Sequence, residues 1–331
     1  MAVRRRKQRR GRSYAWRYRG RIVACVFVEV LIICALVIMV GWNKGVKEWF
    51  EQFEQPVLKE VDISGINSPN AILMQARGGK ILGEINGEAQ IYPASMTKIM
   101  TVILGIENFD DLDEKITLTN EMFTGLYEQD ATQAGFQPGE EVRVIDLLYG
   151  AMLPSGAECC IALADTISGS EADFAELMNK KARKLGMENT NFCDSTGLHN
   201  PDHYSTVKDI AVLMKYCIKN DTFREIVETS RHSTGVTNIH PDGITYYSTM
   251  FKNLSDPTVT GGKILGGKTG YTSEAGHCLV SFAEIEGREY IFVSAGASGA
   301  DGNTIPHIQD AVTVYNRVGA AIEAKMNNNN K

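Results

Sequence analysis

The sequence predicts an α+β fold: a mixed, mainly antiparallel sheet flanked by helices, with an inserted all-helical lobe and an N-terminal transmembrane helix. Three observations predict it. Residues 22–42 are apolar apart from one glutamate, strand-like apolar runs lie before residue 86 and after residue 260, and helical periodicity dominates between them. Strands at both ends of the chain favour one sheet assembled from both ends. We expect this domain at 70–326, with the helical lobe at about 110–255.

The N-terminal region has the pattern of a membrane anchor. Residues 1–21 contain ten Lys or Arg and no Asp or Glu, so a net charge of −6 for the chain leaves −16 for the remainder. An acidic body argues against nucleic acid as a partner. Residues 22–42 would form a helix of ~31 Å, against a hydrocarbon core of ~30 Å. Because basic residues stay cytoplasmic, we expect a single-pass cell-membrane protein with its N-terminus cytoplasmic and the domain at 70–326 outside.

A cleaved signal peptide is the alternative interpretation of this region. Its apolar core should be ~7–15 residues long and end at a small-x-small site. The core at 22–42 is longer, and Gly41-Trp42-Asn43-Lys44 is a poor cleavage site. The sequence therefore favours an uncleaved anchor.

The elements after the anchor follow from local patterns. Residues 43–69 are charged, contain Pro and Gly and lack apolar periodicity, which predicts a stalk. A hairpin over 70–85 with a turn at Gly78-Gly79 and an extended segment at 113–119 come next. Apolar periodicity predicts helices at 97–107, 144–149, about 158–164, 171–185, 207–218 and 306–326. Two strands, 277–285 and 289–297, precede the last helix, and residues 327–331 are expected to be a disordered tail with no further domain after it.

The chemistry is suggested first by Ser95 and Lys98. In a helix, residues i and i+3 share a face, so the lysine amine would lie one turn from the serine hydroxyl. A serine hydroxyl needs a nearby base to become a nucleophile. Alone, this spacing also fits an ordinary helix start, but Ser155-Gly156-Ala157 and Lys268-Thr269-Gly270 follow it. The three motifs in this order are similar to the set of penicillin-binding proteins and class A β-lactamases.

The residues around these motifs narrow the resemblance. The sequence resembles the serine D-alanyl-D-alanine carboxypeptidases, the low-molecular-mass penicillin-binding proteins, over about 70–300. The resemblance rests on these segments: Tyr92–Lys98, Phe174–Phe192, Gly197-Leu198, His203–Thr206 and Gly267–Gly276. It implies a DD-peptidase/β-lactamase-like fold that removes the terminal D-alanine from peptidoglycan stem peptides ending in D-Ala-D-Ala. It also implies β-lactams as covalent inhibitors and no cofactor.

The resemblance implies three catalytic residues. Ser95 would attack the peptide carbonyl and form an acyl-enzyme, and Lys98 would act as the base. A lysine in water is protonated at pH 7, so Lys98 needs burial or a neighbouring cation such as Lys268 to lower its pKa. Ser155 would relay a proton towards the leaving amine.

The same resemblance implies the substrate-binding groups. Lys268 and Thr269 would hold the free carboxylate of the substrate, and Gly270 would let the strand approach it closely. The backbone N–H groups of Ser95 and Tyr271 would form the oxyanion hole.

One position departs from the family pattern. The second motif usually ends in asparagine, and here that residue is Ala157. Either another group substitutes for the amide or turnover is weakened. A D,D-endopeptidase, a β-lactamase and a non-catalytic penicillin-binding sensor therefore stay open as alternatives.

Histidines and cysteines offer no competing site. The six histidines are scattered, which disfavours a Ser-His-Asp triad. The seven cysteines match neither a zinc-site spacing nor a C-x-x-C pair, so we expect buried free thiols and no metal.

Overall fold

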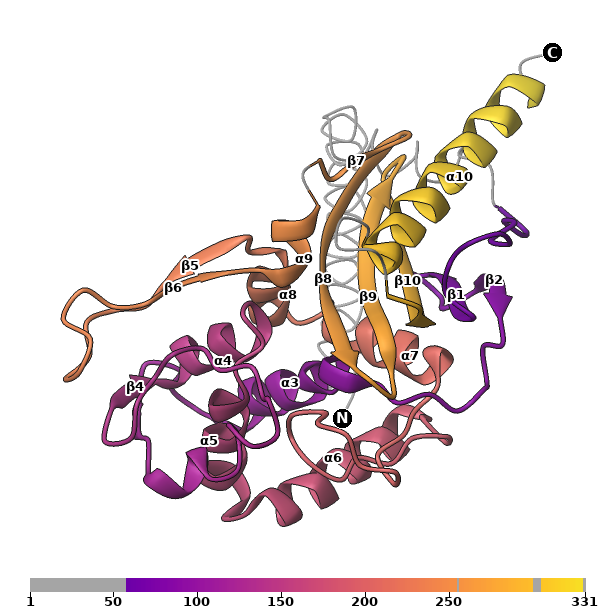
Figure 1. Cartoon of the computed structure of the whole chain (residues 1–331). Coiled ribbons are helices and arrows are strands. Elements are labelled where there is room, and N and C mark those ends of the chain that lie inside the picture. Colours follow the sequence, from indigo (N-terminus) through magenta and orange to yellow (C-terminus); the bar gives the residue numbers. More distant parts are fainter. Residues whose placement is uncertain (1–57, 255, 300–304, 330–331) are drawn as a thin grey trace, which may run out of the picture. The chain divides into compact units, whose positions relative to one another are not determined.

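A computed structural model of the chain describes residues 58–254, 256–299 and 305–329, and its main feature is a six-stranded sheet (Figure 1). The strand order is β2-β1-β10-β9-β8-β7. The strands are β1 (Asn70–Gln75), β2 (Ile81–Ile85), β7 (Thr258–Val259), β8 (Gly262–Thr272), β9 (Gly276–Ile285) and β10 (Arg288–Ala297). The first two strands of the domain thus join the last four, as the sequence predicts.

Every neighbouring pair in this sheet is antiparallel. The prediction of a mixed sheet was therefore wrong in that detail. Short connections join β8 to β9 and β9 to β10, and such short links allow only antiparallel pairing. β1 then pairs with β10 with Ile72 opposite Val293, which joins the two ends of the domain.

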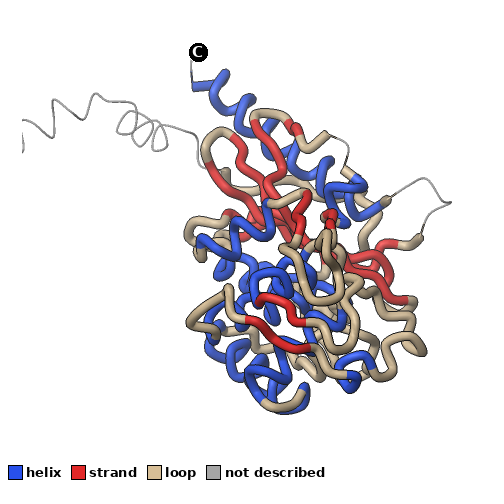
Figure 2. The backbone as a smooth tube through the Cα atoms, turned by 90° about the vertical axis from the view of Figure 1, so that its left-hand side faces the viewer, coloured by secondary structure: helices blue, strands red, loops and turns tan. Residues whose placement is uncertain are grey.

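Helices cover both faces of the sheet. α10 (Pro306–Asn329) packs against β9 and β10 on one face, and its buried side chains include Val314, Tyr315 and Val318. α7 (Val207–Cys217) and α8 (Asp221–Glu228) pack against β10 and β8 respectively. Figure 2 shows the long strands above and most of the helices below. α10 extends through Asn329, so the helix ends later than predicted.

The lobe between the sheet strands contains strands as well as helices. Its helices are α4 (Val144–Met152), α5 (Ala157–Ser168), α6 (Glu171–Leu185) and α9 (Thr249–Asn253), with a 3-10 turn η2 (Asn120–Phe123). Two small antiparallel sheets join them: β3 (Lys115–Thr117) with β4 (Glu141–Arg143), and β5 (Arg231–Ser233) with β6 (Thr245–Tyr247). The prediction of an all-helical lobe was wrong. β3 lies in the segment at 113–119 that was expected to be extended, but β4, β5 and β6 have three residues each and are too short to show periodicity.

The domain begins before the predicted boundary at residue 70. Leu58, Val61 and Ile63 are buried in the core beside α10, although the sequence predicts a stalk there. The carboxylate of Asp310 accepts hydrogen bonds from the backbone N–H groups of Asn67 at 2.8 Å and Ser68 at 2.9 Å. Buried apolar contacts and these hydrogen bonds make residues 58–69 part of the domain.

The predicted basic arm, membrane anchor and first part of the stalk lie outside the described residues. No helix in the described ranges has the length and hydropathy of a membrane span.

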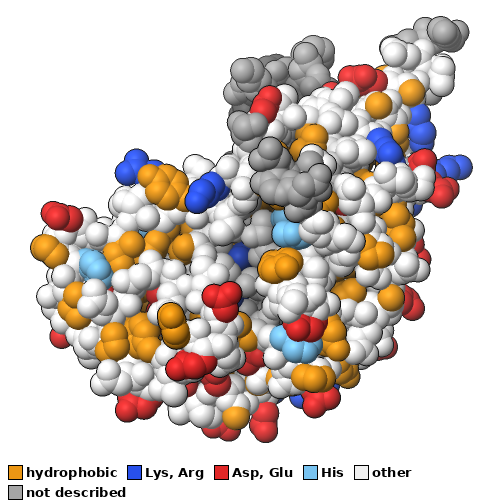
Figure 3. Space-filling model, viewed as in Figure 1, with side chains coloured by type: hydrophobic (Ala, Val, Ile, Leu, Met, Phe, Trp, Pro, Cys, Tyr) orange, Lys and Arg blue, Asp and Glu red, His pale blue; other side chains and the backbone are white. Residues whose placement is uncertain are grey.

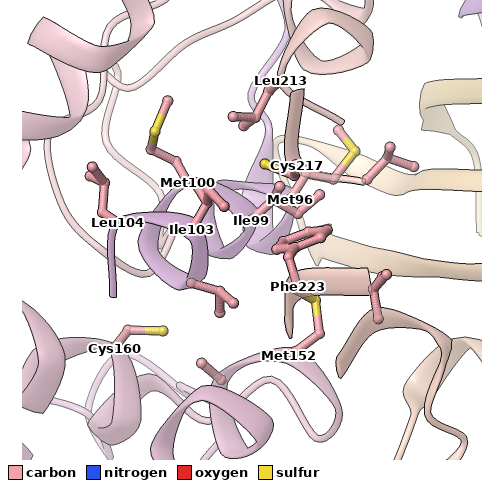
Figure 4. Close-up of a cluster of buried hydrophobic side chains, with 14 of the residues drawn as sticks. Met96, Ile99, Met100, Ile103, Leu104, Met152, Cys160, Leu213, Cys217 and Phe223 are labelled. Atoms are coloured by element: carbon pink, nitrogen blue, oxygen red, sulfur yellow. The ribbon is translucent and has the colours of Figure 1, made fainter. Parts of the chain in front are cut away.

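The helix that follows the Ser95 turn is buried on all sides. α3 (Lys98–Asn108) is buried from Lys98 to Gly105, which is typical of a helix in the core of a domain. Figure 4 shows its side chains and that of Met96 meeting side chains of α4, α5, α7 and α8. The residues labelled there are Met96, Ile99, Met100, Ile103, Leu104, Met152, Cys160, Leu213, Cys217 and Phe223. This packing holds the start of α3 in a fixed position.

Candidate active site

Ser95 lies in a tight turn directly before α3. The 3-10 turn η1 (Ala94–Thr97) contains Ser95, and Lys98 is the first residue of α3. Ala94 has a φ of 46°, in the left-handed region that non-glycine residues avoid at a cost of ~1–3 kcal/mol. Lys98 Nζ donates a hydrogen bond to Ser95 Oγ at 3.1 Å, so the predicted serine–lysine pair is formed. The strained turn aims the serine hydroxyl at this amine.

A second acceptor holds Lys98 in place. Its Nζ donates to the carbonyl oxygen of Thr196 at 2.7 Å, and the side chain is buried. Thr196 belongs to a loop almost a hundred residues further along the chain, and the sequence analysis did not identify it. The two contacts fix the lysine amine between the nucleophile and this loop.

Ser155 reaches the same hydroxyl from the lobe. Its Oγ donates to Ser95 Oγ at 3.0 Å. Ser155 has a φ of 74°, a second strained position at the site, and the N-cap of α5 is Gly156. Ser155 therefore lies one residue before the N-cap and does not itself cap α5. Ala157, where the family has asparagine, is the buried first residue of α5.

Lys268 is a buried lysine on strand β8. Only 1% of its surface is exposed, and among the described residues its Nζ donates to the carbonyl oxygen of Thr269 alone, at 2.9 Å. Burial, together with the nearby charge of Lys98, lowers the pKa of Lys268 well below its usual value. Burial also raises the pKa of the Cys160 thiol, which lies near both lysines, to about 12, so this thiol stays protonated. An acceptor that enters the site would find the Lys268 amine available.

The neighbours of Lys268 place β8 against the Ser95 turn. A Cβ added to Gly270 would lie 3.0 Å from the backbone nitrogen of Ser95, so the glycine allows the strand to approach the turn itself. Thr269 Oγ1 lies 2.7 Å from Thr249 Oγ1 at the start of α9, a contact the sequence analysis missed. The side chain of Tyr271 is 61% exposed, and the oxyanion role of its N–H stays a prediction.

The groups of the site come from three parts of the fold. Ser95 and Lys98 belong to η1 and α3, Ser155 precedes α5, and Lys268 lies on β8. Figure 3 shows the surface over this seam, with basic side chains visible in a depression between the lobe and the sheet. The five cysteines in the described residues are free, and no group of three His, Cys, Asp or Glu there is placed to hold a metal.

A serine hydroxyl held by a lysine amine is the arrangement of serine–lysine acyl-transfer enzymes, in which the lysine takes the place of the triad histidine. The comparisons with known proteins narrow this class. Residues 57–299 match the sequence profile of the D-alanyl-D-alanine carboxypeptidases, and the chain belongs to this family.

Individual relatives agree with the family assignment. The chain is 35% identical over 233 residues to the D-alanyl-D-alanine carboxypeptidase DacF of Bacillus subtilis, covering 69% of this chain and 57% of the relative. It is 33% identical over 262 residues to DacC of Escherichia coli, covering 72% and 58%. The chain thus spans less than two thirds of the length of these two relatives.

Solved structures show the same fold. The crystal structure of the Streptomyces K15 DD-transpeptidase matches with a TM-score of 0.70 and 30% identity, covering 79% of this chain and all of that one. The D-alanyl-D-alanine carboxypeptidase of Mycobacterium tuberculosis has a TM-score of 0.69 at 21% identity, a likeness of fold alone. The predicted DD-peptidase-like fold is confirmed.

Proposed function

We propose that this protein is a membrane-anchored serine D,D-carboxypeptidase that removes the terminal D-alanine from peptidoglycan stem peptides and is acylated by penicillin. One observation carries the proposal: Ser95 Oγ lies 3.1 Å from Lys98 Nζ and 3.0 Å from Ser155 Oγ. The family assignment supports it, and so does the amine of Lys268, which can bind the free carboxylate of a peptide.

The reaction follows from these contacts. Ser95 Oγ attacks the carbonyl carbon between the two D-alanines while Lys98 Nζ takes its proton. The backbone N–H groups of Ser95 and Tyr271 receive the oxyanion. Ser155 relays this proton from Lys98 to the leaving nitrogen, the C–N bond breaks and D-alanine departs. Water then hydrolyses the ester on Ser95 and restores the free hydroxyl.

Lys268 explains why the substrate should carry a free C-terminal carboxylate. Its amine is desolvated and close to Lys98, and both effects disfavour its charged form. A carboxylate beside Nζ favours the charged form, so substrate binding and protonation of Lys268 support each other. An internal peptide bond offers no such charge, which favours a carboxypeptidase over an endopeptidase.

The test uses a fluorescent penicillin and a peptide that ends in D-Ala-D-Ala. Wild type should be labelled and should release D-alanine, which mass spectrometry detects, whereas Ser95→Ala should do neither. A wild type that is neither labelled nor releases D-alanine would refute the proposal.

Three alternatives give different results in the same experiment. Penicillin hydrolysis faster than peptide trimming would indicate a β-lactamase. Transfer of the acyl group to an added amine would indicate a transpeptidase, as the Streptomyces K15 structure is titled. Stable acylation without peptide turnover would indicate a sensor, which the alanine at 157 favours.

Membrane attachment is proposed from the sequence. Residues 22–42 have the length and composition of a single span, and the ten basic residues before them favour a cytoplasmic N-terminus. The full chain should sediment with membranes and should be labelled from outside the cell by penicillin. A form that begins at residue 57 should stay in the supernatant, and a full chain found there would contradict the anchor.

A further inference from the structure

His203 is a buried histidine that contacts the Ser95 turn but not Ser95 itself. Its Nε2 lies 2.9 Å from Thr97 Oγ1, and its Nδ1 lies 3.1 Å from Asp194 Oδ2. A carboxylate can only accept, so the tautomer with its proton on Nδ1 donates to Asp194, and its Nε2 then accepts from the Thr97 hydroxyl. The N–H of Cys193 also points at Nδ1, over a longer distance of 3.3 Å. The histidine thus links Asp194 to the turn that carries the nucleophile.

Asp194 also shapes the loop that holds Lys98. Its Oδ1 accepts hydrogen bonds from the backbone N–H groups of Thr196 at 2.7 Å and Gly197 at 2.6 Å, and from Thr196 Oγ1 at 2.8 Å. The carbonyl of the same Thr196 accepts the hydrogen bond from Lys98 Nζ. Burial opposes the charge of Asp194, but His203 and these donors outweigh it and lower its pKa to about 2. Asp194 is therefore a carboxylate at neutral pH.

The loop lies directly against the nucleophile turn. A Cβ added to Gly197, whose φ is 80°, would lie 1.9 Å from the carbonyl oxygen of Ala94 and 2.8 Å from Thr97 Oγ1. Thr101 on α3 donates to the carbonyl oxygen of Ser195 at 2.6 Å. The loop and the turn are in contact along their length, so a displacement of one is transmitted to the other.

We propose that Asp194 and His203 are positioning residues, which hold the Ser95 turn through Thr97 and hold the Thr196 carbonyl against the Lys98 amine. Neither touches the reacting atoms. The pair keeps the serine hydroxyl and its base at the separation that acylation needs. This inference rests on the proposed function, because it assumes acylation at Ser95.

The test compares three variants with wild type and one control. Asp194→Ala removes the shared carboxylate, Thr97→Val removes one hydroxyl without a change of shape, and Thr97→Ser keeps that hydroxyl. Asp202→Ala is the control, an exposed aspartate in the same loop. The acylation rate by fluorescent penicillin, and kcat and KM for a D-Ala-D-Ala peptide, are measured for each folded protein.

Displacement of a catalytic group by about 1 Å can cost about 100-fold in rate. We expect Asp194→Ala and Thr97→Val to lower kcat and the acylation rate at least about tenfold, with KM within about twofold, because ground-state binding groups are untouched. Thr97→Ser should recover most of the loss, and Asp202→Ala should behave as wild type. If Asp194→Ala fails to fold, the two Thr97 variants decide.

Two results separate the inference from the function on which it rests. A labelled wild type together with a Thr97→Val rate within twofold of wild type would overturn the positioning role alone. An unlabelled wild type would reject the proposed function and this inference with it.

Discussion

Lys268 carries a cost to stability that its replacement should remove. The side chain is buried, its amine makes one hydrogen bond among the described residues, and Lys98 lies nearby. Lys268→Met keeps an unbranched chain of similar size and removes the amine. We therefore expect the variant to unfold at a higher temperature than wild type at pH 7 while it loses affinity for substrates with a free carboxylate.

The size of the effect follows from proton linkage. Because the pKa of Lys268 is lower in the folded state, the unfolded chain binds more protons at every pH between the folded pKa and ~10.4. The free energy of unfolding of wild type should fall by ~1.4 kcal/mol per pH unit, relative to the variant, as pH decreases through that window. Replacement of buried ionic side chains by apolar residues of similar volume is often neutral or stabilises by about 1–4 kcal/mol, which sets the scale expected here. Above pH ~10.4 the amine is neutral in both the folded and the unfolded state, so the pH-dependent part of the stability difference should disappear.

Urea unfolding of both proteins from pH 7 to pH 10.5 measures this difference. Lys263→Met is the matched control, because Lys263 is exposed on the same strand and should give a difference independent of pH. Stability curves for wild type and Lys268→Met that run parallel over the whole range would show that the burial of Lys268 carries no penalty. A variant less stable than wild type at pH 7 would refute the reasoning directly.

Three further predictions test other contacts of the site and the domain. Gly270→Ala should slow acylation at least about tenfold, because its Cβ would meet backbone atoms of the Ser95 turn. Gly235→Ala is the control, since a Cβ there lies 3.7 Å from Arg143 and fits, and equal acylation rates for the two variants would contradict the prediction. Thr249→Val should raise KM by about 2–10-fold at similar kcat, because one hydrogen bond to Thr269 contributes about 0.5–1.5 kcal/mol. An unchanged KM would show that Thr249 does not support substrate binding through Thr269. Asp310→Ala should lower stability by about 3 kcal/mol in denaturant unfolding, because donors from residues 67 and 68 lose their acceptor.

Much of the fold was predictable because its signals are local. The β1–β2 hairpin, β9, β10 and α10 follow from apolar runs and turn residues, and the structure confirms them. Ser95 and Lys98 could be paired because helical spacing brings residues i and i+3 together. Ser155 and Lys268 were found through motifs alone, since no local pattern indicates that segments 60 residues and more apart will meet.

The parts that could not be predicted depend on tertiary contacts. Leu58 and Val61 show no periodicity, yet they are buried once α10 covers them. The acceptor for Lys98 is a backbone carbonyl 98 residues away, and every residue has such a group, so its identity leaves no trace in the sequence. His203 lies in the segment His203–Thr206, which resembles the family, but its contacts with Asp194 and Thr97 require the folded loop.

The same carbonyl gives a physical account of the alanine at 157. The resemblance implies an asparagine there whose amide would contact both the substrate and the lysine base, and Ala157 supplies neither contact. In this structure the Lys98 amine already has two acceptors, Ser95 Oγ and the Thr196 carbonyl, and the second comes from the loop that Asp194 shapes. An amine with two acceptors keeps its position without a third, so the loss at 157 falls on substrate contact rather than on activation of the nucleophile. The substitution should therefore weaken peptide binding more than it weakens acylation by a small β-lactam.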